Sequence, residues 1–121
     1  MASAISVSVP CPGAIAGLSA GTAAAAVGVP AAMLAAPTRS RPTVARARQL
    51  AVYLHHFALG ASVSACARLF ARDRATVRNA LARIETMRDD PRFDHCAARL
   101  QAAIAAQRDM ILALIAEGAA Q

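Results

Sequence analysis

The chain has 121 residues, enough for one small domain and a tail, and arginine alone carries its basic excess (net charge +6), because there is no lysine. The lysine-dependent phosphate loop G-x-x-x-x-G-K-S/T is therefore excluded, so no ATP is expected. Three cysteines without a C-x-x-C pair argue against a disulfide framework and indicate a reducing cytoplasm. No spacing of cysteines or histidines fits a metal site, so neither a metal nor a cofactor is expected.

The first 38 residues contain no charged side chain and are dominated by alanine, glycine, serine and valine. A secretory signal would need a basic segment before the apolar run, and none is present. A membrane span would need about 20 strongly apolar residues, whereas glycines and Pro30 interrupt residues 13–36. We therefore interpret residues 1–38 as a disordered or low-complexity leader, or as residues upstream of the true start codon, and keep membrane association or export as the alternative.

A basic loop from Arg39 to Thr43 leads into a predicted helix that begins at Pro42 or Thr43 and ends near Ala58. Gly60 is the expected stop, because glycine readily adopts the conformation that ends a helix. The residues expected to face the core are Val44, Leu50, Ala51, Leu54 and Phe57.

Residues 62–87 predict two helices joined by a tight turn. Ser62 is placed to cap the first helix, in which Cys66 is expected to be a small core residue, and Asp73 is placed to cap the second. One face of the second helix is apolar, at Val77, Leu81, Ile84 and Met87, and the other carries Arg74, Ala75, Arg78, Asn79 and Arg83. Short polar and cationic groups at the start of the second helix are typical of a helix-turn-helix that reads DNA.

A break at residues 88–91 separates this motif from a long C-terminal helix, for which Asp94 is the expected cap and Gly118 the expected stop. Apolar residues recur along it at spacings of three and four, at Ala97, Leu100, Ile104, Ile111 and Leu114, with Gln107 as an interruption. We favour a helix that packs back on its own domain, and keep a homodimer contact through the same residues as the alternative.

The arginines are unevenly distributed. Six precede Asp73 with no acidic residue among them, whereas seven arginines and seven carboxylates share the chain from Asp73 onward. Helix N-terminal amides and arginines together can bind phosphate, and an arginine-containing loop suits a minor groove. The distribution therefore fits a DNA backbone footprint, and a solvated basic face without a partner is the alternative.

Two short motifs stand out: Ala45 to Ala51, A-R-A-R-Q-L-A, and Phe70 to Val77, F-A-R-D-R-A-T-V. They resemble the C-terminal DNA-binding domain of the bacterial replication initiator DnaA, in which the matching motifs are A-R-x-R-Q-x-A and F-G-(G)-R-D-H-T-T-V. The likeness covers residues 39–100 and is closest to small stand-alone alphaproteobacterial proteins that lack the ATPase domain. Arg74 stands in place of histidine, Ala75 in place of the first threonine and Ala71 in place of the turn glycine, so the preferred site is expected to differ from the initiator's consensus box.

The resemblance implies a role for each matching residue. The residues implied to face base edges are Asp73, Arg74, Ala75, Thr76 and Arg78. Those implied to contact the backbone or the minor groove are Arg39, Arg41, Arg46, Arg48, Gln49 and Arg72. A carboxylate can accept from cytosine, an alanine methyl can contact thymine, and an arginine can donate two hydrogen bonds to guanine. Asp73 has two competing roles, because the same oxygens can cap the helix.

The sequence thus predicts an all-α helix-turn-helix bundle divided into a leader (1–38), the DnaA-like domain (39–100) and a C-terminal helical extension (101–121). The expected function is sequence-selective binding of double-stranded DNA, as a regulator of transcription or replication initiation at DnaA-box-like sites in the cytoplasmic nucleoid. The alternative is a degenerate helix-turn-helix that binds proteins without reading bases. No arrangement of serine, histidine and carboxylates predicts catalysis, so an enzyme is not expected.

Overall fold

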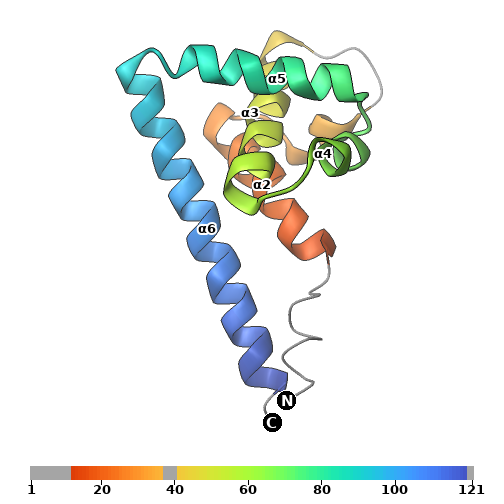
Figure 1. The fold of residues 1–121 in the computed structure, drawn as a ribbon, viewed down its shortest axis with the longest axis vertical. Helices are drawn as coiled ribbons and strands as arrows, with labels where there is room; N and C mark the ends of the chain where they lie inside the picture. Colours follow the sequence, from red (N-terminus) through yellow and green to blue (C-terminus); the bar gives the residue numbers. More distant parts are fainter. Residues whose placement is uncertain (1–11, 37–40, 120–121) are drawn as a thin grey trace.

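The structure is a computed structural model that describes residues 12–36 and 41–119, and all regular elements within these ranges are helices (Figure 1). The elements are α2 (Pro12–Val27), η1 (Ala31–Ala35, a 3-10 helix), α3 (Pro42–Leu59), α4 (Val63–Phe70), α5 (Arg74–Met87) and α6 (Pro91–Ala119). The prediction of an all-α bundle with a central helix-turn-helix is confirmed.

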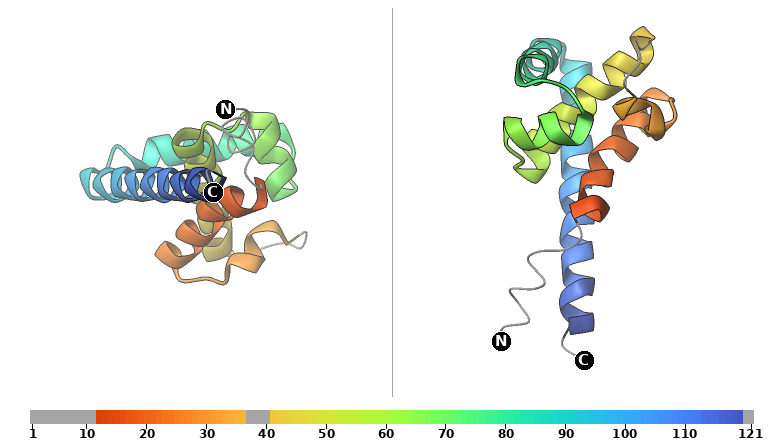
Figure 2. Two further views of the ribbon diagram at one scale, coloured as in Figure 1. Left: turned by 90° about the horizontal axis from the view of Figure 1, so that it is seen from below. Right: turned by 90° about the vertical axis from the view of Figure 1, so that its right-hand side faces the viewer.

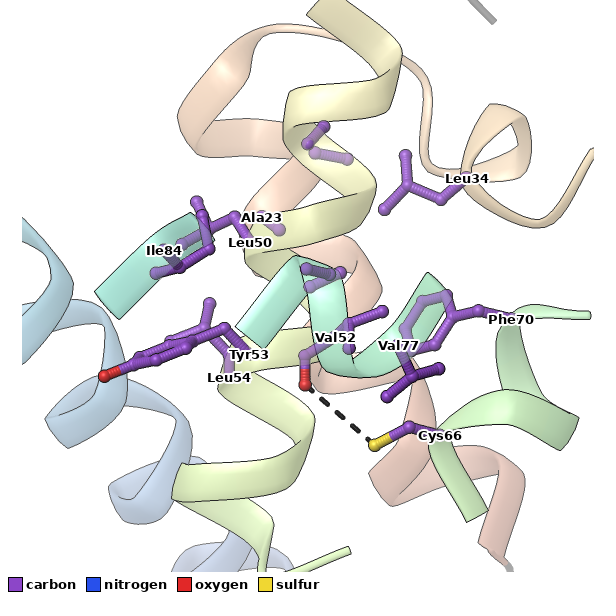
Figure 3. Close-up of a cluster of buried hydrophobic side chains, with 14 of the residues drawn as sticks. Ala23, Leu34, Leu50, Val52, Tyr53, Leu54, Cys66, Phe70, Val77 and Ile84 are labelled. Atoms are coloured by element: carbon purple, nitrogen blue, oxygen red, sulfur yellow. Dashed lines mark hydrogen bonds between the residues drawn. The ribbon is translucent and has the colours of Figure 1, made fainter. Parts of the chain in front are cut away.

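Helix α3 lies at the centre of the fold and packs against α2, η1, α4, α5 and α6. Every residue from Leu50 to His55 is buried, because neighbouring helices surround α3 on all sides at this level. Figure 3 shows side chains from α3, α4, α5, α2 and η1 meeting in one core. Phe57 is an exception to the predicted core face: it is 49% exposed and stacks instead on the ring of Tyr53, 4.7 Å away.

Both predicted caps of the helix-turn-helix are present. The Ser62 hydroxyl accepts a hydrogen bond from the Ala65 amide at 3.0 Å, and an Asp73 carboxylate oxygen accepts one from the Thr76 amide at 2.7 Å. In the turn between α4 and α5, Ala71 has a φ of 53°, the left-handed conformation that costs a residue with a side chain about 1–2 kcal/mol. Ala71 therefore performs the backbone role for which glycine is better suited.

Cys66 is fully buried in this core, as predicted, and its thiol donates to the Val52 carbonyl oxygen over 3.9 Å (Figure 3). Burial raises the pKa of the Cys66 thiol. The thiol is therefore held in its neutral form, which suits a small core residue and not a reactive one.

The expected disordered leader is wrong for residues 12–36. Helix α2 packs along α3, and its Ala23 and Ala24 are buried in the main core together with Leu34 of η1. Alanine gives little hydrophobic stabilisation for each residue, but its small side chain allows two helix backbones to approach closely. Residues 1–11 and 37–38 of the expected leader lie outside the described residues. No helix in the described ranges is both long enough and apolar enough to span a bilayer.

Helix α6 begins at Pro91, three residues before the expected cap, and continues through Gly118. The Asp90 carboxylate accepts from the Arg92 amide at 3.1 Å, and Pro91 occupies the first helical position, where its missing amide has no cost. Asp94 instead forms an ion pair with Arg88 at 2.6 Å. Arg88 also donates to the Tyr53 hydroxyl and the Gln101 side chain, so this cluster joins α3 and the end of α5 to α6.

The N-terminal half of α6 packs on its own domain, which confirms the favoured interpretation of its apolar spacing. Ala97 and Ile104 are buried and Leu100 packs against the core. Ala97 and Ile104 therefore cannot contact a second copy, and this part of the predicted dimer seam is wrong. The C-terminal part extends beyond the other helices (Figure 2), and there Met110 and Leu114 are 65% and 59% exposed.

A buried polar contact joins α2 to α3. The Ser19 hydroxyl and the Nδ1 atom of His55 share a hydrogen bond of 2.9 Å, and both residues are buried. The Phe70 ring of α4 meets the imidazole edge to face, with the centroids 6.1 Å apart. Desolvation lowers the pKa of His55 below its ordinary value of 6.5, so the folded protein holds this imidazole neutral.

Acidification is expected to destabilise the protein through His55. The unfolded chain takes up a proton at a pKa near 6.5, whereas the folded chain resists protonation of His55. The contribution of His55 to the free energy of unfolding is therefore complete above about pH 7.5. It is lost as the pH falls from about 6.5 toward the lower pKa of the folded state. Urea denaturation between about pH 7.5 and 5 measures this loss of unfolding free energy. His55→Gln, which can still hydrogen-bond Ser19, should reduce the pH dependence, and the exposed control His95→Gln should preserve it. Equal pH profiles for His55→Gln and the wild type would contradict the assignment.

Candidate nucleic-acid interface

The N-terminal half of α5 is exposed along one side. Val77 and Ile84 anchor the helix in the core, whereas Arg74, Ala75, Thr76 and Arg78 are all exposed. Figure 1 shows α5 at the edge of the molecule, on the opposite side of the bundle from the end of α6. Among the described residues Arg74 and Arg78 have no hydrogen-bond or ion-pair partner. The structure therefore presents four of the five predicted base-reading residues on one accessible stretch of helix.

Asp73, the fifth predicted base-reading residue, is exposed and acts as the helix cap. The Thr76 backbone amide, and then the Thr76 side chain, lower the pKa of the Asp73 carboxyl group. The carboxylate therefore stays ionised at neutral pH, with one oxygen committed to the first turn of α5.

A cleft of about 550 Å³ lies between α3 and α5. Its α3 wall includes Arg48 and Gln49, its α5 wall includes Thr76, Asn79 and Arg83, and Arg72 borders it from the turn. No acidic side chain lines the cleft. Two predicted backbone-contact residues from α3 thus lie beside α5, the second helix of the helix-turn-helix.

Arg48 lies deeper in the structure than its predicted role suggests, because it is only 9% exposed. Its Nε atom donates to the Leu34 carbonyl oxygen, and its Nη2 atom donates to that of Met33 at 3.4 Å. Burial, and secondarily the charge of Arg72, lower the pKa of Arg48. Arg48 thus holds η1 against α3, and any phosphate contact would have to be made in addition to these bonds.

Arg72 also joins η1 to the helix-turn-helix. Its Nη2 atom donates to the Ala36 carbonyl oxygen at 2.9 Å, and its Nη1 atom donates to those of Phe70 and Ala71 at 3.1 Å. The guanidinium is half-buried and borders the cleft. Two of the six predicted backbone-contact residues therefore organise the surface around the cleft.

The remaining predicted backbone contacts are spread along the start of α3. Arg41 is exposed immediately before the helix, and Gln49 is half-buried in the cleft. Arg46 lines a second cleft, of about 490 Å³, with Ala82, Arg83, Thr86 and Met87. Arg39 lies outside the described residues.

The model of the bacterial DnaA protein helix-turn-helix family matches residues 21–84, more than half of the chain. The chain belongs to this family. The match begins inside α2 and ends inside α5, so the C-terminal part of α2 and all of η1 lie within the matched DnaA helix-turn-helix domain. No curated protein and no solved structure matches the chain significantly.

Membership of the DnaA helix-turn-helix family makes double-stranded DNA the partner of this domain. The family match and the exposed start of α5 agree, because a helix-turn-helix places the N-terminal residues of its second helix against base edges. The cleft beside α5 adds arginine side chains next to that helix and has no acidic lining residue, which suits contact with phosphates.

The helical periodicity places Asn79 and Arg83 on the outward face of α5, but the resemblance assigns neither of them a DNA contact. Their spacing from Thr76, at three and seven residues, places all three on one flank of α5. That spacing was readable in the sequence. The three residues line a cleft only because α3 forms its other wall, and the spacing along α5 does not reveal the position of α3.

Proposed function

We propose that this DnaA-type domain reads the sequence of double-stranded DNA through the N-terminal half of α5, and regulates transcription or replication initiation at DnaA-box-like sites in the nucleoid. The observation that carries the proposal is the exposure of Arg74, Ala75, Thr76 and Arg78 on a helix that buried Val77 and Ile84 anchor in the core. A rigidly held helix presents its side chains in a fixed register, which base readout requires.

The exposed side chains have suitable chemistry for major-groove contacts. Arg74 and Arg78 can each donate two hydrogen bonds to guanine, and the Ala75 methyl can contact the methyl group of thymine. Thr76 supplies a hydroxyl that can donate or accept. Because Arg74 and Ala75 replace a histidine and a threonine of the resembling initiator motif, we propose a preferred site that differs from the initiator's box at the base pairs they face.

Selection from a random double-stranded DNA library with the full chain tests this function. Competition binding at fixed salt should then give a selected duplex at least about tenfold tighter than a scrambled one, because each good base contact discriminates by about 1–3 kcal/mol. Binding that weakens with salt but shows no sequence preference would instead support the degenerate module that binds proteins.

We also propose that two copies of the chain pair through the C-terminal part of α6. Ala97 and Ile104 of the predicted seam take no part in this contact, because they are buried in their own domain. Ile111 is half-buried, whereas Met110 and Leu114 are largely exposed on a stretch whose only charged residue after Asp109 is Glu117. A single module makes few base contacts, so pairing would place two readers on one DNA molecule and increase the overall affinity.

Sedimentation velocity should show the wild-type chain associating at micromolar concentration. Leu114→Glu should shift it to monomer, because a carboxylate in an apolar contact loses its hydration. Ala116→Glu adds the same charge at an exposed position on the other side of α6 and serves as the control. A monomeric wild type, or identical behaviour of both variants, would contradict pairing through this face.

A further inference from the structure

Arg83 borders both clefts beside the recognition helix. It lines the cleft of about 550 Å³ with Asn79, and the cleft of about 490 Å³ with Arg46 and Thr86. Neither cleft has an acidic lining residue. Arg83 is exposed, and it has no hydrogen-bond or ion-pair partner among the described residues. The junction of α3 and α5 therefore carries an accessible guanidinium with open space on both sides.

The other arginines of the first cleft are already engaged. Arg48 and Arg72 donate to backbone carbonyl oxygens at Leu34 and Ala36, and both are less accessible than Arg83. In the second cleft, the buried Nε atom of Arg46 has no hydrogen-bond partner. Arg83 is thus the arginine of the first cleft that is exposed and has no partner among the described residues, and Arg46 adds a second positive charge in the second cleft.

The position of Arg83 along α5 fits the edge of a DNA groove. It lies nine positions after Arg74, and at 1.5 Å per position this places the two Cα atoms about 13.5 Å apart along the helix axis. The major groove of B-form DNA is about 12 Å wide. When the start of α5 contacts base edges, Arg83 therefore lies where the helix leaves the groove and meets the phosphates of the bordering strand.

We propose that Arg83, assisted by Asn79 and Arg46, binds a phosphate of the DNA backbone at the junction of α3 and α5. The guanidinium donates two parallel hydrogen bonds to phosphate oxygens, and the Asn79 amide can donate a third. This contact fixes the angle of α5 in the groove and carries no sequence information. The inference rests on the proposed DNA-reading function.

The test measures the affinity of the full-length wild type, Arg83→Ala and Arg83→Lys for a selected 20-base-pair duplex and for its scrambled version, from low to moderate salt. One lost phosphate contact should reduce the slope of log K against log salt by about 0.9. We expect Arg83→Ala to weaken binding about fivefold to tenfold at 0.1 M salt, equally for both duplexes. Arg83→Lys keeps the charge and should recover most of the slope.

Arg99→Ala is the matched control, because Arg99 is an exposed arginine on α6, away from the clefts. Equal slopes for Arg83→Ala and Arg99→Ala, with a selective wild type, would overturn the phosphate site and leave the proposed function standing. A loss of sequence preference in Arg83→Ala would assign Arg83 to base readout and also overturn the proposal. A wild type that binds no duplex would overturn both the site and the function.

Discussion

Replacing Arg74 by alanine is expected to remove the preference for one base pair of the selected site by a factor of about 5–150. This corresponds to the 1–3 kcal/mol that a bidentate arginine–guanine contact contributes to discrimination. Arg74 is exposed at the first position of α5 and has no partner among the described residues, so its loss leaves the core intact. The measurement is competition binding of the selected duplex against its three single-base variants at each position, at constant salt.

Two further variants distinguish base readout by Arg74 from a general effect of losing one positive charge. Arg99→Ala removes the same charge from α6 and should leave the base preference unchanged. Arg74→His introduces the residue of the resembling initiator motif and should change the preferred base, not simply weaken binding. If Arg74→Ala weakened all duplexes by the same factor, Arg74 would be a backbone contact, and base readout by this residue would be refuted.

Replacing Leu34 by alanine is expected to lower the free energy of unfolding by about 2–5 kcal/mol, because it removes three carbon atoms from a packed site and leaves a cavity. Leu34 is 1% exposed and belongs to the main core, although it lies in η1, within the expected leader. The carbonyl groups of Leu34 and its neighbours Met33 and Ala36 also accept hydrogen bonds from Arg48 and Arg72. Loosened packing of η1 should therefore disturb the rim of the basic cleft as well.

Met33→Ala is the control for this experiment. Met33 is adjacent in sequence, but it is 41% exposed, so its truncation should cost less than about 1 kcal/mol. Urea denaturation followed by circular dichroism measures both variants. Equal stability of the wild type and Leu34→Ala would show that η1 does not contribute to the folded domain in solution.

The local features of the fold were predictable because short-range chemistry specifies them. Ser62 and Asp73 cap their helices as expected, since each side chain accepts from an amide three residues ahead. Gly60 ends α3 with a φ of 71°, as its sequence position indicated. The predicted start of α6 differs from the observed one because Asp90 and Asp94 are both acceptable caps. In the structure Asp90 accepts from the Arg92 amide, and Asp94 pairs with Arg88.

Local signals are enough to predict the helix-turn-helix, its family resemblance and the outward face of α5, because capping residues, helical periodicity and a short motif specify them. The remaining features depend on how distant segments pack. Helix α2 is an alanine-rich segment without a clear apolar stripe, and it becomes part of the core only because α3 offers a surface that Ala23 and Ala24 fit. The role of Arg48 likewise depends on η1, because carbonyl oxygens 14 and 15 residues away hold its guanidinium at the base of the cleft. Contacts of this kind join segments that carry no local signal for each other, so only the packed chain brings them together.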